Sequence, residues 1–209
     1  MKSIRLRDGK ERSLQRRHPW VFEGSIARGS ADAGETVRVE SHAGEFLAWG
    51  AYSPSSMFRV RAWSFDETER IDAAFFERRL RRAIALRARL GIASDGQRLV
   101  HGEADGLPGL IVDRYGDTLS AQFLSAGAER WRVVIADALL AATGLSRLYE
   151  RSDAAARTPQ RQSRHEVNSI ARRQGALAAA PPPLGVRGQR GRRQGRPRQI
   201  GRASCRERV

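Results

Sequence analysis

The chain has 209 residues, of which 40% are hydrophobic and 29% are charged, and its formal net charge at pH 7 is +15. This length suits one medium domain or two small ones, and a single cysteine excludes both a disulfide framework within the chain and a zinc site built from cysteines. No apolar run approaches the roughly 18 residues of a membrane span, and residues 1–17 lack the apolar stretch of a signal peptide. We therefore expect a cytoplasmic protein that has neither a membrane nor a metal as its partner.

The charge is distributed unevenly along the chain. Residues 1–156 contain 24 basic side chains, 21 acidic side chains and every aromatic residue, whereas residues 157–209 contain 14 arginines, no lysine and two glutamates. The second part lacks the apolar groups that would offset the conformational entropy lost on ordering. We therefore predict a first domain over residues 1–70, a second over 71–157 and a disordered tail over 158–209.

The first domain alternates apolar and polar residues in short stretches, as half-buried strands do. Turn-forming residues, such as those at positions 42–44, separate these stretches. Short strands that recur about every ten residues are typical of a small β-barrel. The predicted strands cover residues 4–8, 36–40, 45–52 and 57–65.

The last of these strands places two arginines on one face. Period-2 alternation puts Phe58 on the same side as Val60 and Ala62. The same alternation puts Arg59 and Arg61 together on the opposite side. The strand is therefore predicted to bury its apolar face and to present a basic one.

Five basic residues of the first domain are candidate RNA contacts. Arg16, Arg17 and His18 precede a Pro-Trp pair, and Arg59 and Arg61 lie on the basic strand face. Basic side chains beside a small barrel contact phosphates, and guanidinium or aromatic planes stack on unpaired bases. The alternative from spacing alone is an ordinary polar barrel surface.

After the last predicted strand, the spacing of apolar residues changes from the period of a strand to the period of a helix. Residues 71–91 carry apolar side chains at helical spacing, and Gly91 is a natural stop. The predicted buried stripe consists of Phe76, Leu80, Ala83, Ile84 and Leu90. The arginines around the rest of the helix are predicted to form a solvated face, and contact with a nucleic-acid backbone is the alternative. These arginines are at positions 78, 79, 81, 82, 87 and 89.

In the remainder of the second domain, the sequence pattern predicts the order strand, strand, helix, strand, which is typical of a small α+β domain. Its first short strand, 98–100, precedes a loop at 102–109 that is rich in glycine and proline. The fold class of the whole chain is therefore α+β. The later predicted elements are strands at 110–115, 118–125 and 145–153 and a helix at 128–142.

No catalytic, cofactor-binding or metal-ligating residue is predicted. His101, Glu103 and Asp105 lie close together in the sequence, but they lack the spacing of a metal site, and a turn explains their glycine-rich loop. The sequence has no phosphate-binding loop, nucleophile elbow or dinucleotide fingerprint. Cys205 lies in a segment without a core pattern.

Three motifs, in order and at the expected separations, carry a family resemblance. They are RRHPWVF at 16–22, GAYSP at 50–54 and GEADGLPG at 102–109. Residues 1–157 resemble the N-terminal half of bacterial 23S rRNA (cytosine-C5) methyltransferases. That family has a PUA domain, a central strand-and-helix domain and a C-terminal Rossmann-like domain that binds S-adenosylmethionine.

The resemblance implies an RNA-binding role with 23S rRNA as the partner. It implies a PUA barrel over residues 1–70, with Arg17 and His18 near its RNA-facing surface. The family's cofactor glycines, its Asp-Pro-Pro motif and its nucleophilic cysteine have no counterpart here, and Cys205 does not match that cysteine's context. We therefore expect an inactive N-terminal fragment that binds no cofactor, although the intact family uses S-adenosylmethionine. The alternative is a stand-alone, non-enzymatic PUA-type RNA-binding protein with a basic tail.

The resemblance ends abruptly after residue 157. The following segment is rich in arginine, alanine, proline and glycine, as a shifted reading frame of a GC-rich gene would be. Its last ten residues, 200–209, are similar to the translation of a sequencing adapter. We expect a frameshift followed by adapter sequence, which would leave the second domain truncated. The alternative is a genuine arginine-rich tail that binds RNA phosphates.

Overall fold

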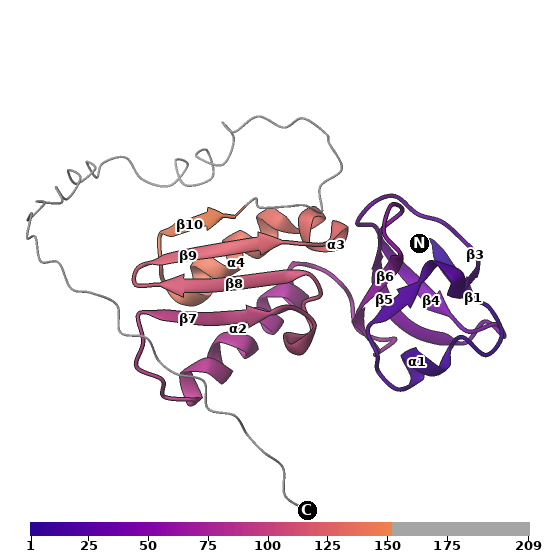
Figure 1. The fold of residues 1–209 in the computed structure, drawn as a ribbon, viewed down its shortest axis with the longest axis horizontal. Helices are drawn as coiled ribbons and strands as arrows, with labels where there is room; N and C mark the ends of the chain where they lie inside the picture. The colour runs from indigo at the N-terminus through magenta and orange to yellow at the C-terminus, as the bar shows by residue number, and fades with distance from the viewer. Residues whose placement is uncertain (152–209) are drawn as a thin grey trace, which may run out of the picture. The chain divides into compact units, whose positions relative to one another are not determined.

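The computed structural model describes residues 1–151, which form a curled sheet followed by a layer of strands and helices (Figure 1). The curled sheet has the strand order β2-β6-β5-β4-β1-β3, and its pairs are antiparallel except for the parallel pair β1–β4. We call it the barrel. Its strands are β1 (Ser3–Leu6), β2 (Trp20–Phe22), β3 (Ile26–Arg28), β4 (Thr36–Glu40), β5 (Phe46–Tyr52) and β6 (Phe58–Ser64), with the short helices α1 (Arg12–Gln15) and η1 (Glu23–Ser25) between them.

Alternation of side chains builds the core of the barrel. In β4, Val37 and Val39 are buried and the residues on either side of them are half-buried. Ile4, Leu6 and Val60 are also buried in the same cluster. The predicted barrel is confirmed, but the alternation did not indicate β2 and β3, because strands of three residues are too short to show a period.

A β-bulge changes the predicted faces of β6. The register between β2 and β6 shifts between Val21 and Phe22, so that Phe22 pairs with Phe58. Val60 is buried as predicted, but Phe58 is half-exposed and lies outside the barrel core. The prediction that Phe58 shares a face with Val60 is therefore wrong, because the extra residue of a bulge breaks the period-2 pattern.

The helix α2 (Ala73–Arg89) confirms the change of period. The Asp72 carboxylate caps it by accepting a hydrogen bond of 3.0 Å from the backbone N–H of Phe75. Phe75, Phe76 and Leu80 are fully buried on its inner face. Leu90 is 60% exposed, which contradicts the predicted stripe, because the helix ends before it.

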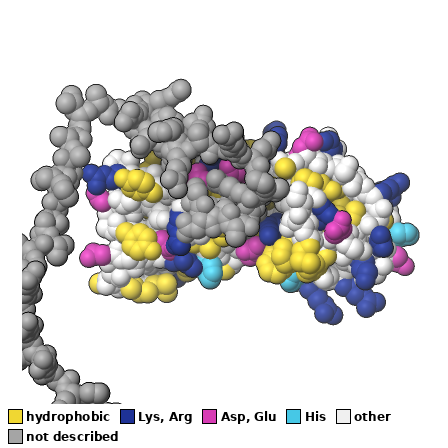
Figure 2. All heavy atoms as spheres, turned by 45° about the horizontal axis from the view of Figure 1, so that its top comes forward, with side chains coloured by type: hydrophobic (Ala, Val, Ile, Leu, Met, Phe, Trp, Pro, Cys, Tyr) yellow, Lys and Arg dark blue, Asp and Glu magenta, His cyan; other side chains and the backbone are white. Residues whose placement is uncertain are grey.

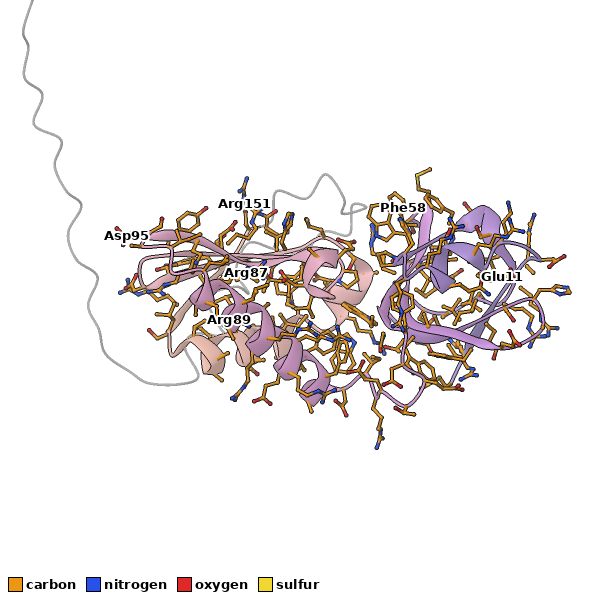
Figure 3. The ribbon with its side chains drawn as sticks, turned by 90° about the horizontal axis from the view of Figure 1, so that it is seen from below. Glu11, Phe58, Arg87, Arg89, Asp95 and Arg151 are labelled. Atoms are coloured by element: carbon orange, nitrogen blue, oxygen red, sulfur yellow. The ribbon has the colours of Figure 1, made fainter. Side chains whose placement is uncertain are left out.

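The second sheet has the strand order β10-β9-β8-β7, and helices α2 and α4 lie on one of its faces (Figures 1 and 3). Neighbouring strands are antiparallel except for β10, which pairs with β9 in parallel after the crossover through α4. The predicted helix at 128–142 is two helices separated at Trp131. The elements are β7 (Gly96–His101), η2 (Gly102–Asp105), β8 (Leu110–Tyr115), β9 (Thr118–Phe123), α3 (Ala126–Arg130), α4 (Arg132–Thr143) and β10 (Arg147–Glu150).

One barrel side chain completes the core of the second layer. Trp63 of β6 is buried, and its ring centroid lies 5.3 Å from that of Phe76 in an edge-to-face contact. Gly127 of α3 packs directly on Ala51 of β5, where any side chain would overlap the Ala51 methyl group. The barrel and the second layer are therefore in close contact at these residues.

Among residues 1–151 no helix has both the length and the apolar character needed to cross a membrane. The predicted tail at 158–209, including Cys205, lies outside the described residues. The boundaries at 70 and 157 stay predictions.

Candidate nucleic-acid interface

The pairing of β2 with β6 assembles a row of aromatic rings on the outer surface of the barrel. We call His18, Trp20, Phe58 and Phe22 the aromatic row. Successive ring centroids along it are 5.3 Å, 4.8 Å and 5.2 Å apart. Phe22 is 46% exposed and the neighbouring Met57 is 65% exposed. Figure 3 shows Phe58 on the outer side of the barrel. The row is therefore an apolar surface that meets solvent.

Arg61 lies against this row. Its guanidinium carbon is 5.1 Å from the centroid of the Phe58 ring, a cation–π contact. Its Nε and Nη1 atoms are buried and have no hydrogen-bond partner within residues 1–151. Burial lowers the pKa of Arg61, and the carboxylate of Glu103 opposes this shift. The group remains a cation that holds unused hydrogen-bond donors.

Arg59 does not share this surface. Its side chain is 12% exposed and forms a salt bridge with the carboxylate of Glu23. Its Nη1 also donates a long hydrogen bond of 3.5 Å to the carbonyl of Ser53. The bulge therefore separates two arginines that the sequence pattern predicted on one strand face. Arg59 instead stabilises the end of the strand.

The structure exposes Arg16, Arg17 and His18 directly after α1. Arg17 has a φ of 63°, and no other non-glycine residue in the described part of the chain has a positive φ. Its guanidinium carbon lies 5.5 Å from the centroid of Phe65. His18 Nδ1 accepts a hydrogen bond of 3.3 Å from the backbone N–H of Trp20, which joins this segment to the aromatic row. Figure 2 shows hydrophobic side chains gathered on the barrel near lysine and arginine side chains.

A cavity of about 340 Å³ lies beside Arg17. Pro19 and Phe65 line it from the barrel side, and Glu103 and Arg79 line it from the second layer. The Trp20 indole N–H donates a hydrogen bond of 3.0 Å to the Glu103 carboxylate. This bond fixes the middle of the aromatic row against the second layer.

The acidic side chains of the GEADGLPG loop at 102–109 hold α2 and β2 in place through hydrogen bonds. The two carboxylate oxygens of Asp105 accept hydrogen bonds of 2.5 Å and 2.7 Å from Arg87 of α2, and one of them also accepts from the backbone N–H of His101 at 2.6 Å. Glu103 holds Trp20. No cluster of three or more histidine, cysteine, aspartate or glutamate side chains suited to a metal occurs in residues 1–151. Each acidic side chain of this loop therefore has a structural partner.

Sequence reasoning missed the aromatic members of the interface. Trp20 and Phe22 belong to a stretch of only three residues, and the period-2 pattern assigned Phe58 to the core. The position of aromatic residues directly after Arg16–His18 was the available signal, because aromatic and basic residues together are typical of single-strand binding surfaces.

Comparison with known proteins agrees with the architecture. Residues 4–65 match the family model of the PUA-like domain, so the barrel is a PUA-like domain. The chain is also homologous to ribosomal RNA large subunit methyltransferase I. It is 51% identical over 156 residues to that protein from Klebsiella pneumoniae and 49% identical over the same length to those from Shigella boydii and Escherichia coli. Each alignment covers 73% of this chain and 39% of the relative, so the chain spans well under half the length of these relatives.

Solved structures share the fold. A protein of Streptococcus mutans, described as a SAM-dependent methyltransferase, superposes with a TM-score of 0.64 at 18% identity, covering 72% of this chain and 40% of its own. A second structure, described as a methyltransferase complexed with SAH, has the same TM-score and coverage at 17% identity. At this level of identity the likeness concerns the fold alone.

Proposed function

We propose that this chain binds ribosomal RNA of the large subunit through the aromatic row and the basic residues beside it. The observation that carries the proposal is Arg61, a half-buried cation with unused donors set against an exposed aromatic surface. The PUA-like domain and the homology to a ribosomal RNA methyltransferase support RNA as the ligand. In this proposal the partner is 23S rRNA, met in the cytoplasm.

The five predicted residues take different roles in this proposal. Arg16 and Arg17 are exposed and contact phosphates. His18 and Arg61 lie at the aromatic row and contact bases or phosphates. Arg59 acts indirectly by holding the end of β6 through Glu23. The RNA-binding unit is residues 1–70, and residues 71–157 support it.

The proposal also concerns the enzyme family to which this RNA-binding part would belong. We infer that residues 1–157 correspond to the RNA-binding part of a 23S rRNA (cytosine-C5) methyltransferase whose intact form uses S-adenosylmethionine. This chain itself is proposed to be a catalytically inactive fragment that transfers no methyl group, with no catalytic residue assigned. Isothermal titration calorimetry with S-adenosylmethionine should show no saturable heat, and saturable binding would refute this part.

RNA binding is tested by fluorescence anisotropy of the full chain with a labelled 23S rRNA transcript. The variant Arg16→Gln/Arg17→Gln should weaken binding and reduce the salt slope by about one or two. The matched control is Arg81→Gln/Arg82→Gln, which removes two exposed charges from α2. A loss with the control and none with the first variant would instead assign binding to the α2 arginines.

A further inference from the structure

We propose that the aromatic row is a binding site for unpaired nucleotides, with Phe22 and Phe58 as the stacking positions and Arg61 as the cation beside the bound strand. This inference rests on the proposed function and deepens it, because it names the form of RNA that the surface accepts. It also assigns binding to apolar side chains that carry no charge.

The geometry of the row suits exposed base faces. Phe22 and Phe58 are cross-strand neighbours at the sheet edge formed by β2, and their ring planes are inclined by 57°. They therefore present separate ring faces and not one flat plate, so each ring takes its own base. In a duplex, base faces are covered by the adjacent pairs, so only unpaired nucleotides can stack on protein rings.

Trp20 lines the site, and its side chain is held in position by its neighbours. Its indole N–H is held by Glu103, and its ring packs on Phe58 with a centroid distance of 4.8 Å. His18 in turn lies edge-on to Trp20. These contacts occupy the inner part of the row and leave Phe22, 46% exposed, and the half-buried Phe58 as the accessible rings.

Arg61 supplies the polar part of the site. Its buried Nε and Nη1 have no acceptor among residues 1–151, although buried polar groups in native proteins are nearly always hydrogen-bonded. Its guanidinium carbon lies 5.1 Å from the centroid of Phe58, so its charge lies next to any base that stacks on the row. A phosphate of the same nucleotide would be attracted by the positive charge of this guanidinium.

The β-bulge between β2 and β6, together with two contacts of Glu23, fixes the position of the exposed phenylalanines. The register shift at Phe22 turns Phe58 out of the core, and the backbone N–H of Glu23 donates a hydrogen bond of 3.0 Å to the carbonyl of Met57. The Arg59–Glu23 salt bridge then holds the same strand end. Bulges that redirect a side chain are common beside binding sites. The exposed phenylalanine faces are thus held in place before any ligand arrives.

The test is fluorescence anisotropy of the full chain with three labelled RNAs of about 12 nucleotides, a length within the range that single-strand binding domains cover. The probes are an unstructured single strand, the same strand in a blunt duplex, and a strand in which abasic sites replace the bases. The abasic strand keeps the phosphate charge and removes only the stacking faces. We expect the single strand to bind at least about tenfold more tightly than the other two, from the stacking of one base or more.

Substitutions in the aromatic row test whether the preference for single-stranded RNA arises there. Phe22→Leu and Phe58→Leu should each weaken single-strand binding by about tenfold and leave abasic-strand binding unchanged. Tyr115→Leu, which removes an exposed aromatic ring from β8, is the matched control and should have no effect. Phe58→Trp keeps a stacking face and should retain the affinity, which separates stacking from a general loss of folding.

Three outcomes would overturn the inference, and they differ from failure of the proposed function. Equal affinity for single strand and duplex, or for single strand and abasic strand, would show that the bases are not stacked. Unchanged single-strand affinity in both leucine variants would show that the row is not the site. Absence of binding to every RNA, including the 23S transcript, would refute the proposed function itself and would leave a protein partner as the occupant of the row.

Discussion

Arginines serve different purposes in the two regions of this chain. In the second layer, Arg87 makes two hydrogen bonds to Asp105, and Arg98 pairs with Asp113 at 2.8 Å. On the outer face of the barrel, by contrast, Arg16, Arg17 and Arg61 have no salt bridge to any described residue. The number of charged side chains alone therefore does not identify a binding surface. What distinguishes Arg61 is that two of its guanidinium nitrogens are buried without a hydrogen-bond partner beside an aromatic ring.

The first prediction concerns the paired arginines of the second layer. Replacing Asp105 with alanine leaves Arg87 as a buried charge without its partner, and the two side chains are only 5% and 13% exposed. We expect the free energy of unfolding to fall by about 3–5 kcal/mol, measured by urea denaturation. The protein that remains folded should bind RNA with unchanged affinity.

A surface pair provides the control for this variant. Arg81 and Glu77 form an exposed i,i+4 salt bridge on α2. Arg81→Met should change stability by no more than about 0.5 kcal/mol. An equal cost for both substitutions would contradict the distinction between buried and exposed pairs.

The second prediction tests the contact between the barrel and α3. Gly127→Ala would place a methyl group against Ala51 and Trp63, so we expect a loss of about 1–3 kcal/mol in thermal or urea unfolding. Gly24→Ala is the matched control, because a methyl group there meets no atom within 4 Å. A neutral Gly127→Ala would mean that this contact is not tightly packed in solution.

The third prediction is that substitution of Arg61 changes stability and RNA binding in opposite directions. Arg61→Met removes a half-buried charge with unpartnered donors from beside Phe58 and puts an unbranched apolar side chain in its place. We expect the free energy of unfolding to rise by about 1 kcal/mol, while affinity for single-stranded RNA falls. A destabilised variant would show instead that the attraction to Glu103 dominates.

The fourth prediction concerns the pH dependence of stability at Glu69. Burial raises the pKa of Glu69, but hydrogen bonds from Ser64, Arg78 and Arg79 together outweigh burial and leave the pKa below its ordinary value. A lowered folded-state pKa contributes stability that is present above the unfolded value near 4.5 and is lost as pH falls below it. Glu69→Gln should therefore lose stability, by less than about 1 kcal/mol, at pH 7 and should lose less at pH 3. An equal loss at both pH values would contradict this role.

Local sequence patterns were sufficient for the elements that bury one face. The alternation in residues 36–40 predicted β4, and the helical stripe around Phe76 and Leu80 predicted α2. These patterns succeed because each buried position repeats with the period of its own element. The two strands of three residues and the break at Trp131 left no such repeat.

The candidate site depended on features that no local pattern carries. The bulge that turns Phe58 outward is a property of the pairing between β2 and β6 and not of either strand alone. The partners of Arg59 and Trp20, which are Glu23 and Glu103, are likewise set by tertiary contacts. Sequence therefore indicated the basic residues of the face but not which of them keep free donors.

The decisive measurement is ultraviolet crosslinking of the full chain to single-stranded RNA containing 4-thiouridine, followed by peptide mapping. It shows whether unpaired nucleotides lie on the aromatic row. We predict crosslinks in the peptides that contain Trp20, Phe22 and Phe58, and their loss in the Phe22→Leu/Phe58→Leu variant. Crosslinks confined to α2 or to the second sheet, with none on the barrel, would show that unpaired RNA binds elsewhere on the chain.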